Sequence, residues 1–217
     1  MKALDFSRVS LYVNDNIDVF HAARLGSLSK LNIRRLTNKN PYLFRAKNMV
    51  TASDIVRDMM VAFLSSSEEE MFGRFLEDLA IYVCSETIGG HKSTTAGLDL
   101  EFIGENGTYY VVAIKSGTNW GNSSQQAKLV EDFNLAARRL LQSKLTRNVQ
   151  PVLGICYGRT RTSYMKQGYV KVVGQNFWAL ISSSRNLYKE IIEPIGYRAK
   201  QHNEAYELER SRIENPS

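Results

Sequence analysis

"LDLEFIGENGTYYVVAIKSG", residues 98–117, consists of two short apolar segments separated by a turn that contains Asn and Gly. The segments are rich in β-branched and aromatic residues, and they predict a β-hairpin over residues 97–116. Three ionisable residues interrupt the apolar pattern: Asp99, Glu101 and Lys115. The register of the hairpin determines whether these three side chains can meet.

A two-residue turn at 106–107 would place Asp99 opposite Ile114 and would turn Lys115 to the other face of the sheet. Charge would then be distributed over both faces of a sheet that has to be covered by helices. We disfavour this register for that reason.

A three-residue loop over 105–107, with Gly107 in the left-handed conformation and a bulge, pairs Ile103 with Tyr109 and Asp99 with Ala113. In this register the three charged residues share one face. The opposite face is entirely apolar and can pack on a helix: Leu98, Leu100, Phe102, Val112 and Ile114. We adopt this register.

Helical patterns precede the hairpin. Apolar spacing predicts one helix over 52–65, a break at "SSSEEE", and a second helix over 68–85. Ser67 and Glu70 fit a capping box at the start of the second helix. The second helix is expected to have an apolar face formed by Met71, Phe72, Phe75, Leu76, Leu79 and Val83.

Helix and strand patterns alternate after the hairpin. A polar loop, "GTNWGNSSQQ", leads into a long amphipathic helix expected over 123–145. "VQPVLGICYG" and "YVKVVG" are typical of buried neighbouring strands, and the C-terminal part is expected to be helical with a charged tail from about 198. The alternation predicts an α/β fold with a mixed central β-sheet flanked by helices.

The chain has the composition of an ordinary globular protein. It has 217 residues, of which 43% are hydrophobic and 23% are charged, so it can bury a substantial core. We expect residues 1–66 to form a helical, basic segment packed on a core of residues 67–217, the two forming one compact domain. The core is expected to include the C-terminal helices.

No apolar run is long enough to span a membrane, and the start of the chain lacks the apolar stretch of a secretory signal. We therefore expect a cytoplasmic protein with no membrane partner. Cys84 and Cys156 lie in unrelated contexts without metal-ligand spacing, and both are expected to be buried thiols.

Charge is unevenly distributed along the chain. Residues 1–50 carry nine Lys and Arg against three Asp and Glu, residues 51–105 carry three against eleven, and residues 123–175 carry nine against two. Basic segments around an acidic centre are typical of an enzyme that binds a polyanion and a divalent cation. Solvated surfaces of opposite sign would give the same distribution.

An acid near the end of one strand, followed by acid-x-Lys on the next, resembles the signature of the PD-(D/E)XK nuclease superfamily. Asp99 matches the first acid and Lys115 the lysine. Four segments, "FGRFLEDLA", "GLDLEF", "IKSGTNWGNSSQ" and "GQNFWALI", are similar to stand-alone type II restriction endonucleases, and the similarity spans roughly residues 40–200. The sequence departs from the pattern at Leu98, which replaces a proline, and at Ala113, which stands where the second acid is expected.

The resemblance implies a restriction-endonuclease-like core and a homodimeric enzyme that hydrolyses double-stranded DNA with one or two Mg²⁺ ions per site. Mg²⁺ usually takes one or two protein carboxylates together with waters and phosphate oxygens. Asp99 supplies one, and Glu101, two residues further on the same face, is the best replacement for the missing acid. Lys115 would orient the attacking water. Glu77 matches a superfamily position that sometimes binds metal, although a solvated Glu is an equal interpretation.

Polar and basic residues near the hairpin are candidates for contacts with DNA. Each has an alternative as an ordinary surface or capping residue, because helix N-termini and flexible basic loops occur in every class of protein. The candidates are Lys92, Asn119, Asn122, Gln125, Arg159 and Arg161.

Two other functions remain open. Ala113 is also what a DNA-binding protein on the same fold would carry if its catalysis had been lost naturally or removed by engineering. A junction or repair nuclease would share the same core.

Overall fold

The computed structural model describes residues 2–29, 42, 46–48, 51–144, 146, 148–159 and 161–214. Contacts divide the chain into two compact units. The first combines Met1–Val13 with Gly73–Glu193, and the second combines Asn14–Phe72 with Pro194–Ser217.

The first unit is built on a six-stranded sheet in the order β1-β2-β3-β4-β6-β5. The neighbours β3, β4 and β6 are parallel, whereas the other pairings are antiparallel. This arrangement confirms the predicted α/β fold with a mixed sheet. The strands are β1 (His91–Lys92), β2 (Leu100–Ile103), β3 (Tyr109–Lys115), β4 (Val149–Ile155), β5 (Ser163–Tyr164) and β6 (Val170–Val173).

The hairpin of β2 and β3 has the register with the three-residue loop. Ile103 pairs with Tyr109 and Glu101 with Val111, and Gly107 has a φ of 74°. The predicted loop and the pairs from Glu101 to Ile103 are confirmed. Before β2, the backbone N–H of Asp99 donates to the carbonyl of Val112, the partner of Leu100, at 2.9 Å, so Asp99 does not continue the same register.

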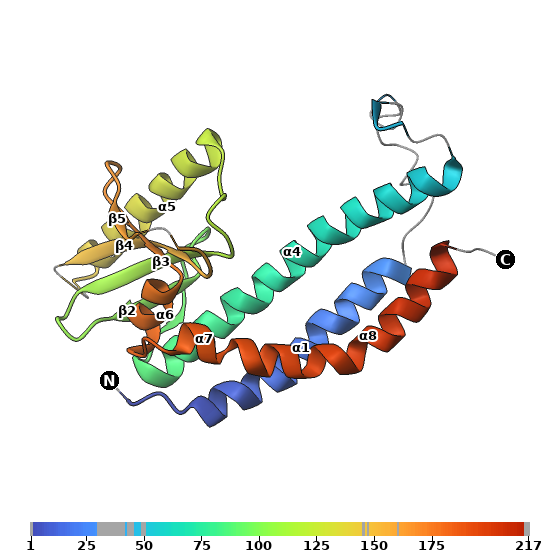
Figure 1. Cartoon of the computed structure of the whole chain (residues 1–217). Coiled ribbons are helices and arrows are strands. Elements are labelled where there is room, and N and C mark those ends of the chain that lie inside the picture. Colours follow the sequence, from blue (N-terminus) through green and yellow to red (C-terminus); the bar gives the residue numbers. More distant parts are fainter. Residues whose placement is uncertain are drawn as a thin grey trace. The chain divides into compact units, whose positions relative to one another are not determined.

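Helices cover both faces of this sheet (Figure 1). Helix α5 (Ser123–Gln142) lies on one face, where its apolar side packs against β3 and β4. Helix α6 (Gln175–Ser182) lies on the other face, and the Phe177 ring leaves room for no side chain at Gly154. A short helix, α7 (Leu187–Glu190), follows.

One assignment of a hairpin residue was wrong. Leu98 was expected on the apolar face with Leu100, but it belongs to the buried cluster on the α5 side, with Val111 and Ala113. Its N–H donates to the carbonyl of Thr95 at 3.2 Å. Leu98 therefore lies in a turn before β2, where the alternation of a strand does not apply.

The predicted helix break at "SSSEEE" was also wrong, because α4 is one continuous helix over Ala52–Thr87. The serine and glutamate side chains find partners that are compatible with a helix. Ser66 donates to the carbonyl of Ala62 one turn earlier, and Glu68 forms an ion pair with Arg24 at 2.5 Å. A serine that bonds back to its own helix does not end it.

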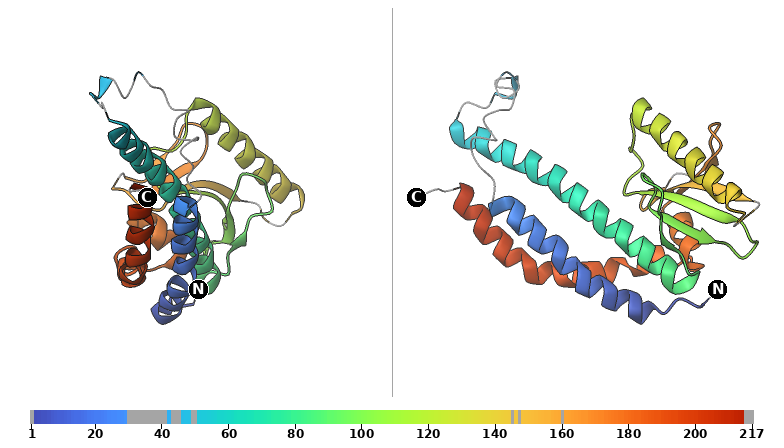
Figure 2. Two further views of the ribbon diagram at one scale, coloured as in Figure 1. Left: turned by 90° about the vertical axis from the view of Figure 1, so that its right-hand side faces the viewer. Right: turned by 180° about the vertical axis from the view of Figure 1, so that it is seen from behind.

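The second unit is helical. The later part of α1 (Phe6–Ser29), the first part of α4 and α8 (Ile192–Glu214) run side by side (Figures 1 and 2). Tyr206 of α8 joins a buried cluster with Leu28, Met60 and Leu64. The C-terminal segment is thus helical to Glu214, and it packs with α1 and α4 in a unit other than that of the sheet. This division differs from the one expected at residue 66.

Cys84 and Cys156 are free and buried, as predicted. In the described part of the chain, no helix has the length and apolar character needed to cross a membrane.

Candidate active site

Asp99 and Lys115 meet at the edge of the sheet where the parallel strands end. Lys115 is the last residue of β3, and Asp99 immediately precedes β2. The Lys115 Nζ lies 3.6 Å from the Asp99 Oδ2, and the backbone N–H of Ile114 donates to the same oxygen at 2.6 Å. The Lys115 side chain is 25% exposed and the Asp99 side chain is 16% exposed, so a substrate can reach both.

Glu77 of α4 is the second carboxylate of this edge. Burial raises the pKa of Glu77 above its ordinary value of 4.5, and the negative charge of Asp99 raises it further, whereas Lys115 and Lys92 oppose the rise. These influences place Glu77 within electrostatic range of the Asp99–Lys115 pair. Both carboxylates supply the oxygen ligands that Mg²⁺ prefers.

Within the described ranges there is no group of three or more His, Cys, Asp or Glu residues arranged to hold a metal ion. Mg²⁺ does not require such a cage, because waters and substrate phosphates usually complete its coordination. Asp99 and Glu77 have the ligand chemistry, carboxylate oxygens, that such an ion takes from a protein.

Glu101 of β2 pairs with Val111 of β3, further from the edge of the sheet than Lys115. It is 2% exposed, and its carboxylate accepts hydrogen bonds from Ser93, Tyr109 and Arg139 at 2.6, 2.9 and 2.6 Å. Burial would raise the pKa of Glu101, but these hydrogen bonds outweigh burial and hold the pKa below its ordinary value. The structure thus brings Asp99 and Lys115 together and gives Glu101 a different set of partners.

Ala113 lies in the middle sheet strand β3, where it pairs with Leu153 of β4. Its side chain is fully buried in the cluster between the sheet and α5, together with Val111, Leu129 and Leu153. Ala113 is a core residue of β3 that lies two positions before Lys115 on the same face.

Most of the predicted DNA contacts lie on loops at this edge of the sheet. Asn119 and Asn122 follow β3, whereas Arg159 and Arg161 follow β4, which runs parallel to β3. Lys92 of β1 pairs with Leu100, next to Asp99. These side chains are exposed, so a polyanion along the edge could contact several of them at once.

Asn122 and Gln125 also have a structural role. The Asn122 side chain accepts from the Gln125 N–H at 3.0 Å, and the Gln125 side chain accepts from the Asn122 N–H at 3.0 Å. They form the capping box of α5, in which Asn122 is the N-cap.

The sequence interpretation did not include Arg139, the cation that binds Glu101 from α5. A signal for it existed, because a glutamate predicted inside a covered strand needs a charged partner. Nothing in the local sequence indicates which of the basic residues that partner is.

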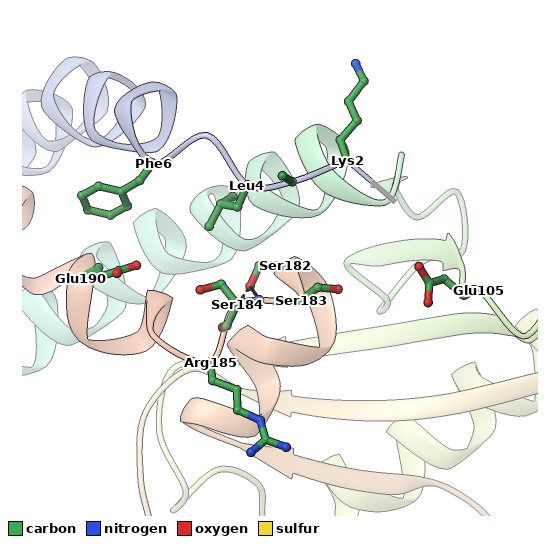
Figure 3. A pocket seen from close by; sticks show the side chains of 10 residues that line it. Lys2, Leu4, Phe6, Glu105, Ser182, Ser183, Ser184, Arg185 and Glu190 are labelled. Atoms are coloured by element: carbon green, nitrogen blue, oxygen red, sulfur yellow. Dashed lines mark hydrogen bonds between the residues drawn. The ribbon is translucent and has the colours of Figure 1, made fainter.

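The hollow drawn in Figure 3 lies at the other end of β3. It has a volume of about 730 Å³ and is lined by Glu105 of the hairpin loop, by Lys2 and neighbours, and by residues 182–185 at the end of α6. The Lys2 and Arg185 side chains point away from each other, so they do not form a common anion site (Figure 3). None of the predicted site residues lines this hollow.

The raised pKa of Glu77 gives a prediction for stability. A carboxyl group whose pKa is higher in the folded than in the unfolded state stabilises the fold at pH values below its ordinary pKa. This stabilisation is lost as the pH rises through the pKa of the folded state. We expect Glu77→Gln to raise the melting temperature of the metal-free protein at neutral pH and to have no such effect below pH 4.5. Glu105→Gln, at an exposed loop position, is the control. An equal effect of Glu77→Gln at both pH values would contradict the raised pKa.

The six-stranded mixed sheet flanked by helices is consistent with a restriction-endonuclease-like core. A family model described as "Type II restriction endonuclease EcoO109I" matches residues 7–203. The chain belongs to this family, which is one of DNA nucleases. A search of curated proteins found no match.

Proposed function

We propose that this protein is a Mg²⁺-dependent endodeoxyribonuclease that hydrolyses double-stranded DNA at specific sequences as a type II restriction endonuclease. The observation that carries the proposal is the Asp99–Lys115 pair at the edge of the sheet, in a chain that belongs to a restriction endonuclease family. Assignment to the PD-(D/E)XK superfamily rests on the same two residues.

We propose that Lys115 acts on the phosphate. The ion pair with Asp99 and the neighbouring Trp120 ring, 5.5 Å from the Lys115 Nζ, hold the ammonium at the accessible edge. A cation at that point orients an attacking water and stabilises the charge that develops on the phosphate oxygens.

We propose Asp99 and Glu77 as the residues that would hold Mg²⁺. When bound, the ion would neutralise phosphate charge and lower the pKa of a water molecule. The Ile114 N–H fixes one oxygen of Asp99, and the mutual repulsion of Asp99 and Glu77 is relieved when both face a cation. Glu77 is favoured over Glu101 because both oxygens of Glu101 already accept hydrogen bonds inside the protein.

We propose that DNA runs along the carboxyl edge, where Lys92, Arg159 and Arg161 contact phosphates and Asn119 contacts the duplex. Asn122 and Gln125 present the N-terminus of α5 to a phosphate, since anions bind favourably at that end of a helix. Cutting both strands of a duplex requires two active sites, and a homodimer supplies them with two-fold symmetry.

Ala113 favours a second candidate function, that of a DNA-binding protein without catalysis. The residue at this position is a fully buried alanine in place of an acid. Incubation of the purified protein with Mg²⁺ and mixed-sequence DNA distinguishes the candidates. Discrete fragments that disappear with a chelator support restriction, cuts only at branched structures support a junction or repair nuclease, and binding without cutting supports the inactive candidate.

Binding to DNA should depend steeply on salt. Each phosphate contact contributes about 0.9 to the slope of log K against log salt through counterion release. We expect the double variant Arg159→Gln/Arg161→Gln to lower this slope by about 2, as measured by fluorescence anisotropy across a salt series. Lys189→Gln on α7 is a matched exposed control and should leave the slope unchanged. An unchanged slope in the double variant would remove these arginines from the DNA surface.

A further inference from the structure

The segment that carries Asp99 into the site is tied to Glu101. Ser93 donates its hydroxyl to Glu101 Oε1 at 2.6 Å, and the same hydroxyl accepts from the Thr95 N–H at 3.0 Å. The Ser93 N–H donates to the carbonyl of Asp99 at 3.1 Å, so both ends of segment 93–99 are held together. Glu101 therefore anchors the segment at its first residue.

Arg139 connects the same segment to α5. One guanidinium nitrogen lies 2.6 Å from Glu101 Oε1, and the other donates to the hydroxyl of Thr94. The hydroxyl of Tyr109 donates to the second oxygen of Glu101 at 2.9 Å, and burial, with a smaller contribution from this bond, raises the pKa of Tyr109 to about 12. Helix α5, strand β3 and segment 93–99 thus meet at one buried carboxylate.

We propose that Arg139 and Glu101 are positioning residues that hold segment 93–99, and with it Asp99, in the geometry needed to bind the divalent cation. The proposal rests on the proposed function for the role of Asp99. It assigns Glu101 an indirect role instead of the direct ligand role expected from the sequence.

The bonds of Glu101 with Ser93, Tyr109 and Arg139 are strong enough to hold the segment in place. Hydrogen bonds to a charged group are stronger than neutral ones, and a planar guanidinium that bonds two partners also fixes their separation. Removal of Arg139 would leave a 2% exposed carboxylate without its cation, so Glu101 would have to find water or a proton. Either change releases Ser93 and Thr94 from their present positions.

The test compares four variants by two measurements. Arg139→Met removes both guanidinium bonds, Arg139→Lys keeps the charge, and Tyr109→Phe removes one hydrogen bond at little cost in packing. Arg138→Met, the neighbouring exposed arginine of α5, is the matched control. Mn²⁺ affinity is measured by electron paramagnetic resonance without DNA, and amide hydrogen exchange is measured residue by residue.

We expect Arg139→Met to weaken Mn²⁺ binding by about 10- to 100-fold, as removal of groups that orient metal ligands usually does. Exchange should accelerate at the amides of Thr95, Leu98 and Asp99 more than in β3 and β4. Arg139→Lys should recover part of both effects, Tyr109→Phe should have a smaller effect, and Arg138→Met should have none.

Three results would overturn the proposal. Unchanged exchange over 93–99 in Arg139→Met would show that the segment does not depend on this network. An equal increase throughout the sheet would indicate a role in global stability alone. Tighter Mn²⁺ binding in Arg139→Met would indicate that the released Glu101 is itself a ligand. If wild-type protein binds no Mn²⁺ while exchange accelerates only over 93–99, the metal-dependent function fails and the positioning of the segment stands.

Discussion

We expect Lys115→Met to reduce DNA cleavage by about 100- to 1,000-fold, the usual effect of removing one group that stabilises charge in the transition state. DNA affinity should stay within several-fold of wild type, because Lys115 acts on the reacting phosphate more than on docking. Asp99→Asn keeps the size of the side chain and removes its charge, and it should cause a comparable loss. Single-turnover cleavage and fluorescence anisotropy measure the two quantities separately.

Lys166→Met is the matched control for Lys115→Met, since Lys166 is an exposed lysine in the turn before β6. It should cut DNA at the wild-type rate. Cleavage by Lys115→Met at a rate near that of wild type would exclude this edge of the sheet as the active site. Loss of both cleavage and DNA binding in Lys115→Met would indicate a docking role instead.

The second large effect is expected at Ala113. Position 113 lies two residues before Lys115 in β3, so a carboxylate there would start from the strand face of Lys115. We expect Ala113→Glu to increase Mg²⁺-dependent cleavage at least about tenfold over Ala113→Gln, which has the same size without the charge. Additional carboxylate ligands strengthen Mg²⁺ sites.

Both variants should lose about 1–3 kcal/mol of stability, because position 113 is fully buried among apolar side chains. Denaturant unfolding would measure this loss, and cleavage would be compared at a temperature where both proteins are folded. Equal cleavage by the Glu and Gln variants would show that position 113 does not contribute to the site, leaving Glu77 as the second carboxylate.

The hairpin register was predictable because it depends on short-range rules. Side chains alternate along a strand, and the length of the loop and Gly107 fix which residues pair. The register alone does not fix the Asp99–Lys115 contact, because Asp99 precedes β2 and its N–H donates to the carbonyl of Val112, the partner of Leu100. The helix boundary at "SSSEEE" failed for the opposite reason, since the partners that keep Ser66 and Glu68 helical include Arg24, which lies far away in sequence.

The candidate site shows the same contrast. The sequence placed Asp99, Glu101 and Lys115 on one face of a mixed sheet, and family membership agrees with the nuclease resemblance of the segments around them. Only the packing of α5 shows that Glu101 binds Arg139, and only the packing of α4 brings the charge of Glu77 close to Asp99. Residue spacing determines which side chains share a face, but the availability of a buried carboxylate depends on partners that folding brings from distant segments.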